Sequence, residues 1–484
     1  MTQSRTGPPA RFRPTRRTLR VAAAALTGLV TLLAVGATAG CAGQTQRSSD
    51  TSITVWSLEN NAERVRLIQQ NLARFTQHTG IRVRLVPVDM DQFPSLVTSA
   101  AAADDLPDVI GVVGLAHVRQ LSVNQLLHPT AVGEVVQALG RQTFLPRALR
   151  LTADRGRQLA VPSDGWGQIL VYRRDLFAAA GLAPPEDYQR LLAAARALHR
   201  PGRAGIALAT APDATMTQET FEHLALANGC QLTDRTGRVA LDSPACVQAL
   251  RLYTELARSY SVPGSQNVES TRATYFSGRA AMVLWSSFLL DELAGLRNNA
   301  RPSCQQCRAD PGFLARNSGV VTRLRGPLGG EPAQYGEITS WTVTAHARTA
   351  PAKRLIEYMM SEGYPDWLRM APEGKFPVRA GIRTDPQRYT RAWAQAEAGV
   401  DTKAPLSRFY GPQVLAALGA SPGSFQRWGL EQGQGDLVGG ILGELPVPRT
   451  IAELAGSGGD LDRAVAAGAR QTTEEVTAIQ ESLR

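Results

Sequence analysis

The sequence predicts an α/β fold with a parallel sheet, divided into two lobes. Between residues 53 and 113, segments with the two-residue period of strands alternate with segments that have the 3.6-residue period of helices. Short connections join these segments, an order that indicates parallel strands in one sheet. The chain has 484 residues, whereas a single hydrophobic core rarely exceeds about 250–300 residues. A hydrophobic content of 43% is typical of a globular protein, so two lobes are expected.

The first forty residues have the composition of an export signal. They contain six arginines and no acidic residue, and an apolar run, "VAAAALTGLVTLLAV", occupies residues 21–35. A basic segment followed by a short apolar one is typical of a secretory signal, and the run is shorter than the roughly 20 residues that cross a membrane. We therefore expect residues 1–40 to be a signal peptide. "TRRTLR" at residues 15–20 resembles a twin-arginine signal with Leu19 in place of Phe, so two export routes stay open.

A cysteine follows this signal directly, in the stretch "ATAGCAG" at residues 37–43. The small residues before Cys41 resemble the bacterial lipobox, although Thr38 stands where the lipobox usually has Leu. The resemblance implies that Cys41 is lipidated and that residues 41–50 are a polar tether to the membrane. The alternative is an ordinary signal peptide in which Cys41 has no special role.

The net charge of +10 is concentrated in this leader. Six of the 52 basic residues lie in residues 1–40, so the rest of the chain has 46 basic against 42 acidic residues. No later block of Lys or Arg appears, and the chain therefore lacks the electrostatic pattern of a nucleic-acid-binding protein. No second stretch of 18 or more apolar residues occurs, so membrane contact is expected only through lipid at Cys41.

The clearest elements come directly after the tether. "ITVWS" at residues 53–57 alternates in polarity as a strand does. A helix that Gly80 terminates follows, and its buried stripe recurs at spacings of 3, 4 and 3: Val65, Ile68, Leu72 and Phe75. Further elements are expected at residues 81–88 (strand), 92–103 (helix) and 106–113 (buried strand). Because ligands bind at the carboxyl ends of such strands, the loop "WSLENN" at residues 56–61 is a candidate site.

The remaining four cysteines form two pairs that are close in sequence, Cys230 with Cys246 and Cys304 with Cys307. An exported chain matures in an oxidising compartment, where disulfides are the default. The first pair would close a loop of about 15 residues, worth roughly 3 kcal/mol. "CQQC" at 304–307 could instead be a redox pair or half of a zinc site, but no nearby His or Cys completes the ligand set. We expect disulfides and no metal.

Residues 155–185 carry the most informative pattern. "QLAVP" at 158–162 is expected to be a strand, "SDGWG" at 163–167 a polar loop and "QILVYR" at 168–173 a second strand. "QLAVP", "LVYRRDLFAAAGL" and "PPEDYQRL" resemble G-K-x-Y-G-V-P, L-Y-Y-N-K-D-L-F…A-G-L and P-P-x-T-W-x-E of extracellular solute-binding proteins of ABC importers, a group that includes maltodextrin-binding lipoproteins. The chain departs from this pattern at "VYRRD" and at Tyr188, where Trp is usual.

Further resemblances follow in the family's order and extend over nearly all of residues 51–484. They include "LALANGCQL", "YFSGRAAMVLWSSFLLDEL", "EITSWTVTAHARTAPAKRLIEYMMSEGYPDWLRMAPEGKFPVR" and the last helix. The resemblance implies a periplasmic-binding-protein-like clamshell, in which two α/β lobes close on a ligand cleft at a hinge. Mapped on this chain, it predicts lobe 1 at 51–162 and 339–375, lobe 2 at 163–338, and a C-terminal helical segment, 376–484, that completes the lobes.

A sugar cleft combines aromatic rings, which stack on the C–H faces of the sugar, with polar side chains that bind the hydroxyls. Four of the seven tryptophans fall on cleft-facing segments by this mapping, although each could instead be a packing residue. The candidate ligand-binding residues are Trp56, Glu59, Asn60, Asp164, Trp166, Trp285, Glu337, Trp341, Phe409 and Tyr410. Trp367, Trp393 and Trp428 lie in expected helices and are predicted to be packing residues.

The expected function is capture rather than chemistry. We expect a monomeric, extracytoplasmic protein, anchored to the cell membrane through lipid at Cys41, that binds a carbohydrate without a cofactor and delivers it to an ABC permease. The same fold could bind a polyamine, a peptide or a phosphorylated ligand, or act as a sensor, since Glu59, Asp164 and Glu337 would also suit a cation.

A secreted hydrolase is the competing class of function. "GASPG" at residues 419–423 satisfies G-x-S-x-G, but that motif requires a strand before the Ser and a helix after it. Here a helix-like segment precedes the Ser and Pro422 follows it, so a turn is expected. The six histidines are scattered without metal-ligand spacing.

Overall fold

The computed structural model describes residues 51–90 and 92–483 of the chain. The predicted signal peptide, the lipidation site Cys41 and the tether up to residue 50 lie outside these residues. Within them, no helix combines the length and the apolar character needed to cross a bilayer.

The main strands form one mixed sheet in the order β10-β6-β9-β3-β1-β2. These strands are β1 (Ser52–Ser57), β2 (Arg82–Pro87), β3 (Val109–Val113), β6 (Val161–Arg173), β9 (Gln334–Val343) and β10 (Phe376–Pro377). Three more strands extend it: β7 (Met282–Ser286) and β8 (Ser318–Val321) pair with β6, and β13 (Phe425–Gln426) pairs with β9. The predicted parallel unit is confirmed, because β1 pairs in parallel with both β2 and β3.

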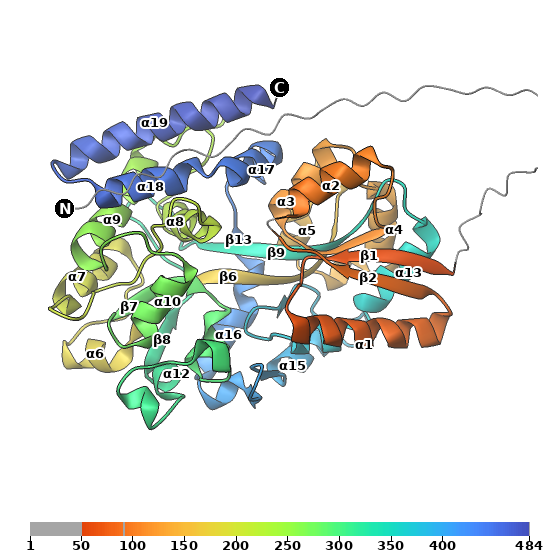
Figure 1. The fold of residues 1–484 in the computed structure, drawn as a ribbon, viewed down its shortest axis with the longest axis horizontal. Coiled ribbons are helices and arrows are strands. Elements are labelled where there is room, and N and C mark those ends of the chain that lie inside the picture. Colours follow the sequence, from red (N-terminus) through yellow and green to blue (C-terminus); the bar gives the residue numbers. More distant parts are fainter. Residues whose placement is uncertain (1–50, 91, 484) are drawn as a thin grey trace, which may run out of the picture. The chain divides into compact units, whose positions relative to one another are not determined.

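Two antiparallel strands, β6 and β9, pass between the two lobes. The first half of β6 pairs with β9 and β10, whereas its second half, from residue 168 onward, pairs with β7 and β8. The C-terminal end of β9, from Ser340 to Val343, pairs with β3. Figure 1 shows both strands running from the part with β1–β3, here called lobe 1, to the part with β7 and β8, here called lobe 2. We call β6 and β9 the hinge strands.

The polar loop predicted at residues 163–167 was wrong, because these residues are the middle of β6. Ser163 and Asp164 are buried, and the Ser163 hydroxyl donates to Asp164 Oδ1 at 2.6 Å and to the Thr339 carbonyl at 3.2 Å. The polar composition suggested solvent exposure. In the fold, polar neighbours satisfy these side chains, so the backbone can continue in the sheet.

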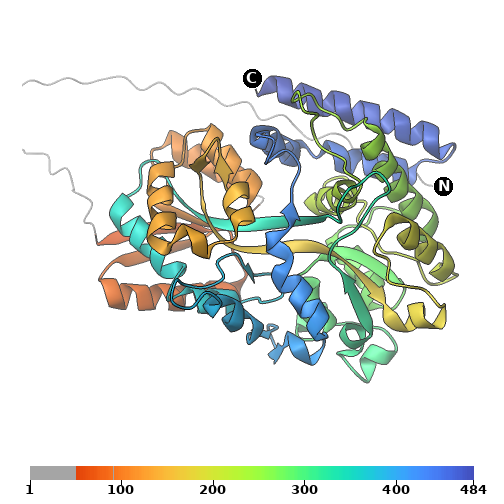
Figure 2. The same ribbon diagram turned by 180° about the vertical axis from the view of Figure 1, so that it is seen from behind.

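The helices of lobe 1 begin with α1 (Ala62–Thr79), which forms as its pattern predicts. The Asn61 side chain caps its first turn, Gly80 ends it with a φ of 72°, and the predicted apolar stripe is buried. The other helices are α2 (Phe93–Ala102), α3 (Leu115–Val123), α4 (Pro129–Leu139), α5 (Pro146–Leu151), α13 (Thr349–Met359), α14 (Tyr364–Arg369) and α15 (Arg388–Ala394). Figures 1 and 2 show α1 on one side of β1 and β2 and α2–α5 on the other, which explains why the core strands are apolar.

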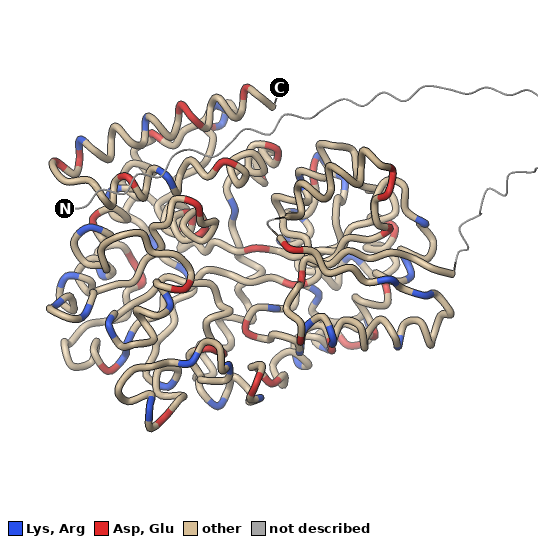
Figure 3. Tube along the Cα trace, viewed as in Figure 1, with Lys and Arg blue, Asp and Glu red and all other residues tan. Residues whose placement is uncertain are grey.

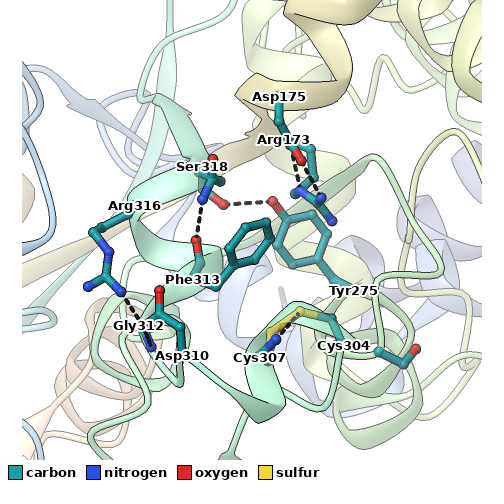
Figure 4. Close-up of a disulfide and its surroundings, with 12 residues drawn as sticks. Arg173, Asp175, Tyr275, Cys304, Cys307, Asp310, Gly312, Phe313, Arg316 and Ser318 are labelled. Atoms are coloured by element: carbon teal, nitrogen blue, oxygen red, sulfur yellow. Dashed lines mark hydrogen bonds and ion pairs between the residues drawn. A yellow bond between two sulfur atoms is a disulfide. The ribbon is translucent and has the colours of Figure 1, made fainter.

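Lobe 2 surrounds β7, β8 and the second half of β6. Its helices are α6 (Arg174–Ala179), α7 (Tyr188–Leu198), α8 (Thr215–Ala227), α9 (Pro244–Tyr260), α10 (Val268–Phe276), α11 (Leu289–Leu293) and α12 (Phe313–Asn317). Both predicted disulfides are present, Cys230–Cys246 and Cys304–Cys307. Figure 4 shows the second beside Tyr275, whose hydroxyl is hydrogen-bonded to the Ser318 hydroxyl at 2.8 Å. This disulfide is buried and therefore belongs to the core of lobe 2.

The C-terminal segment touches both lobes. It comprises α16 (Pro412–Ala420), β13, α17 (Gly435–Glu444), α18 (Pro446–Gly456) and α19 (Leu461–Ser482). Helix α17 packs on α3 of lobe 1, while α18 and α19 pack on α9 of lobe 2 (Figure 1). The predicted turn at "GASPG" is found: α16 ends at Ala420, and residues Ser421–Gly423 form a single turn of 3-10 helix.

Short elements complete the described chain. They are the strand pairs β4 (Ala153–Asp154) with β5 (Arg157–Gln158) and β11 (Glu397–Ala398) with β12 (Ala404–Pro405), and 3-10 turns at Arg141–Thr143, Asn298–Ala300, Gln306–Arg308 and Leu406–Arg408. Figure 3 shows basic and acidic residues interspersed over both lobes, in line with the balanced charge that follows the leader.

The hinge strands approach the C-terminal segment so closely that Gly336 should tolerate no side chain. A Cβ at this position of β9 would lie 1.9 Å from the Phe425 ring of β13. We expect Gly336→Ala to lower the free energy of unfolding by about 1–3 kcal/mol, since overpacking forces the ring or the strand to shift. Urea unfolding would measure this, with Gly330→Ala as the control, because nothing lies within 4 Å of a Cβ there. Equal effects of the two substitutions would contradict the packing argument.

Candidate ligand cavity at the hinge

A cavity of about 590 Å³ lies between the lobes beside the hinge strands. Its wall consists of residues from lobe 1, from β6 and β9, from lobe 2 and from α17. The lining residues are Leu58, Glu59, Arg64, Met90, Pro94, Val112, Gly114, Ala116, His117, Asp164, Trp166, Thr215, Glu219, Phe288, Glu337, Thr339, Lys375, Leu442 and Gly443. The volume is in the range of about 300–1,000 Å³ that small-molecule sites occupy.

Two aromatic rings give the cavity an apolar surface. Trp166 of β6 is half-buried, and its ring centroid lies 6.2 Å from that of Phe288, which follows β7. Tyr335 lies behind Trp166 at 6.0 Å, and the Arg64 guanidinium is 5.3 Å from the Phe288 centroid. These contacts hold both rings in place, so they can stack on the apolar face of a ligand.

Asp164 and Lys375 form a polar pair in the same wall. Lys375 Nζ lies 3.6 Å from Asp164 Oδ2 and 4.3 Å from the centroid of the Trp367 ring. Asp164 Oδ1 accepts hydrogen bonds from the Ser163 hydroxyl and from Trp367 Nε1. Among the described residues none donates to Asp164 Oδ2, and none accepts a hydrogen bond from Lys375 Nζ, although Lys375 is only 2% exposed. The pair thus offers an acceptor and up to three donors to the cavity.

A buried network of charged side chains lies beside the part of the cavity wall that β9 forms. The Arg427 guanidinium, 4% exposed, binds the Glu337 carboxylate and lies 3.3 Å from Glu222 Oε1. Glu337 Oε1 also accepts from the backbone N–H of Leu115, the first residue of α3, at 2.8 Å. Although burial lowers the pKa of Arg427, the carboxylates around it hold that pKa well above its ordinary value. Glu337 therefore connects the hinge to lobe 1, and Arg427 connects it to lobe 2.

His117 of α3 faces Glu337 across the cavity wall. Burial lowers the pKa of His117, and the Glu337 carboxylate opposes that shift. In the part of the chain that the structure describes, no group of three His, Cys, Asp or Glu side chains is placed to hold a metal ion.

Four of the ten predicted ligand-binding residues line the cavity, namely Glu59, Asp164, Trp166 and Glu337. Asn60 is a neighbour of this wall but points elsewhere, because its side-chain amide donates to Asp89 Oδ2 at 3.1 Å.

The other predicted aromatic residues lie away from the cavity. Trp56 and Trp285 are buried in strands at 7% and 6% exposure, and Trp341 is buried at 1% with its centroid 5.1 Å from that of Trp367. Both faces of these strands are covered, so a side chain at a strand end still packs in the core. Phe409 and Tyr410 line a separate groove beside Tyr172, and the Tyr410 hydroxyl donates to the Leu290 carbonyl at 2.7 Å.

Several lining residues are not among those predicted from the sequence. The largest omissions are Lys375, Glu219, Arg64, His117 and Phe288. Lys375 lies in "GKFP" at residues 374–377, inside the segment 337–379 that carries the family pattern. Its position in that pattern could have indicated a place near the cleft. Glu219 lies on α8, a helix whose hydrophobic stripe gives no sign that one of its turns faces a cavity.

Known proteins resemble this chain in sequence and in fold. Residues 60–296 match the family model of bacterial extracellular solute-binding proteins. The chain is also 28% identical over 365 residues to YcjN, a proposed ABC transporter periplasmic-binding protein of Escherichia coli strain K12, which covers 74% of this chain and 79% of YcjN. The resemblance found in the sequence is thus confirmed.

Solved structures share the fold. The maltose-bound MalE3 of T. maritima superposes with a TM-score of 0.65 at 17% identity, over 88% of this chain and 99% of that one. A sugar transporter of Arthrobacter chlorophenolicus with bound laminaribiose gives a TM-score of 0.64 at 15% identity, over the same 88% and 99%. The predicted two-lobed α/β fold class is confirmed by these neighbours.

Removing the buried cation should destabilise the whole protein. We expect Arg427→Met to lower the free energy of unfolding by about 3–5 kcal/mol at neutral pH, because the carboxylates of Glu222 and Glu337 would stay buried without a cation. Urea unfolding monitored by tryptophan fluorescence would measure the change. Arg190→Met is the control, since this half-exposed arginine pairs with Glu186 and Asp187 at the surface. Its loss should lower the free energy of unfolding by less than about 1 kcal/mol. Similar losses in both variants would contradict the role of burial.

Proposed function

Since this chain is a solute-binding protein of the ABC-transporter type, we propose that it captures a mono- or oligosaccharide and delivers it to a membrane permease. The observation that carries the carbohydrate proposal is the cavity wall, which combines two aromatic rings with polar side chains whose charges are mostly paired. A sugar presents apolar C–H faces and neutral hydroxyls, and such a wall is complementary to both.

The pairing of the charges favours a sugar over a cationic solute. Arg64 Nη1 lies 3.2 Å from Glu59 Oε2, Lys375 lies beside Asp164, and Arg427 binds Glu337. A polyamine would bring several positive charges to acids that already have cations of their own. A phosphorylated solute would find cations that are already bound to carboxylates. A neutral polyhydroxyl ligand requires no further charge, and the members of these pairs that line the cavity can hydrogen-bond to it.

Asp164 and Lys375 are well placed to bind adjacent hydroxyls. The carboxylate oxygen accepts a hydrogen bond from one hydroxyl, and the ammonium donates a hydrogen bond to the oxygen of the next. Proteins of the same fold that hold maltose or laminaribiose support a sugar as the solute here, although their low identity leaves the particular sugar open to experiment.

The hinge between the lobes suggests how a bound solute would be presented to the permease. Closure of lobes 1 and 2 around the ligand would shift the population towards a form that the permease recognises. We propose the lobe limits given by the sequence, with crossings near residues 162 and 338, both of which fall within the hinge strands. The protein is further proposed to be a monomer without catalytic activity, held outside the cytoplasm by lipid on Cys41. Stable anchoring requires more than one acyl chain.

A thermal-shift screen tests the solute class. The purified protein would be heated with maltose, laminaribiose, tagatose, ribitol, spermidine and amino acids. A ligand at 100 times its Kd adds about 2.7 kcal/mol of stability, which raises the melting temperature visibly. A rise with a sugar or polyol supports the proposal, whereas a rise with spermidine alone would replace it.

The Lys375 side chain should contribute directly to sugar affinity. We expect Lys375→Met to weaken binding of the sugar found in the screen by about 10–100-fold, because hydrogen bonds to a charged group are worth about 1.5–3 kcal/mol. Isothermal titration calorimetry would measure this below the melting temperature of the variant. Lys353→Met, which removes a partly exposed lysine paired with Glu134 on another face, should leave the affinity unchanged. Unchanged affinity in Lys375→Met would remove this residue from the site.

A further inference from the structure

Glu219 is the carboxyl of the cavity wall that has no cation of its own. It lies on α8 in lobe 2, and its Oε1 accepts a hydrogen bond from the Tyr335 hydroxyl at 3.2 Å. Its Oε2 lies 3.5 Å from the side-chain amide nitrogen of Gln168. Among the described residues Glu219 forms no ion pair, in contrast to the other acids of the wall, Glu59, Asp164 and Glu337.

The guanidinium of Arg427, near Glu219, is already bound to two other carboxylates. Arg427 binds Glu337 and Glu222, and its guanidinium lies 4.6 Å from the centroid of the Tyr335 ring. With both carboxylates ionised, these two acids and one cation carry a net charge of −1. Burial raises the pKa of Glu222 too, but Arg427 and the backbone N–H of Trp428, which bind this carboxylate directly, oppose the rise. An ionised Glu219 would make the buried group doubly negative, which is costly away from water. A proton on Glu219 avoids this cost.

The described titratable groups of α8, α9 and α18 near this site leave no unpaired positive charge. Burial lowers the pKa of His223, which is buried on α8, to about 3, and its Nδ1 accepts from the backbone N–H of Tyr335 at 3.1 Å. Arg449 of α18, which packs on α8, is paired with Glu475. On α9, which also packs against α8, the Tyr253 hydroxyl donates to the Ala209 carbonyl at 2.6 Å.

The pKa of Glu219 agrees with this geometry. Burial raises it to about 8; Arg427 and the Tyr335 hydroxyl act in the opposite direction, while Glu337 and Glu222 add to the rise. The carboxyl is therefore mainly neutral at pH 7 and ionises as the pH passes 8.

We propose that Glu219 holds a proton at neutral pH and donates it in a hydrogen bond to an acceptor oxygen of the bound solute. Oε1 accepts the shorter hydrogen bond, from the Tyr335 hydroxyl at 3.2 Å, and Oε2 accepts only the longer one from the Gln168 amide at 3.5 Å, so we assign the proton to Oε2. That the bound solute offers an acceptor oxygen rests on the proposed function, whereas the protonation of Glu219 does not depend on it.

The direction of the pH effect follows directly. A protonated carboxyl donates a hydrogen bond to a sugar oxygen, whereas an ionised carboxylate repels that oxygen and must first take up a proton from water to bind in this way. Affinity should thus be constant below pH 7 and fall by about tenfold for each pH unit above 8. Glu219→Gln places a neutral donor in the same position, so it should bind at all pH values.

The proton can be tested without any ligand. Infrared difference spectra of the purified protein would be recorded in the carboxylic-acid region from pH 6 to pH 10, for the native protein and for Glu219→Gln. Burial also raises the pKa of Asp291 well above its ordinary value, so both proteins should share a background neutral-carboxyl signal. We expect a further component at pH 7 that is lost mainly between pH 7 and pH 9 and is missing from Glu219→Gln. Glu357→Gln is the control and should keep this component, since burial also raises the pKa of this half-buried glutamate on α13, away from the cavity. A spectrum of Glu219→Gln that equals the native spectrum at every pH would overturn the proposal.

The donor role is tested by calorimetry with the panel sugars maltose, laminaribiose and tagatose. We expect the Kd of the native protein to rise about tenfold from pH 7 to pH 9, and that of Glu219→Gln to change by less than about twofold. The same rise in both proteins would overturn the donor role. Failure of every sugar to bind would contradict the proposed function, while the infrared result would still decide whether Glu219 holds the proton.

Discussion

The buried guanidinium of Arg427 is the contact on which the arrangement of the lobes depends. It binds Glu337 on a hinge strand and Glu222 on α8, and Glu337 in turn accepts the first N–H of α3. The hinge, lobe 1, lobe 2 and the C-terminal segment thus meet at one group of charges. Because buried ions are tolerated only when each has its partners, this requirement fixes the positions of all four parts.

The same requirement determines the character of the cavity. Paired carboxylates and cations lie in its wall among apolar side chains and two aromatic rings, so polar groups are offered while little net charge faces the solute. Such a surface suits a ligand with many hydroxyls, since each wall residue can bind a neutral group without losing its own partner. Glu219 departs from this pattern, and a proton takes the place of the missing cation.

The C-terminal segment closes the molecule across the hinge. Phe425 of β13 fills the space above Gly336, and α17 then returns to α3 and brings Leu442 and Gly443 to the cavity. The packing of α18 and α19 on α9 holds this segment against lobe 2. A change in the length of α17 would therefore alter the size of the space that the solute can occupy.

The sequence by itself determined the local elements and their order. The stripe of α1, the parallel strands β1–β3, the two disulfides and the family pattern all depend on residues near one another in the chain, where periodicity and spacing carry the information. Glu59, Asp164, Trp166 and Glu337 could be proposed for the site because strand order and the family pattern place them at the cleft, although the last three lie within the hinge strands. The tertiary structure alone decided which polar residues share a wall, because Glu59, Glu219 and Lys375 come from distant segments. It also decided that Trp341 packs in the core while Trp166 faces the cavity, since the exposure of a side chain depends on what the other lobe and the C-terminal helices cover.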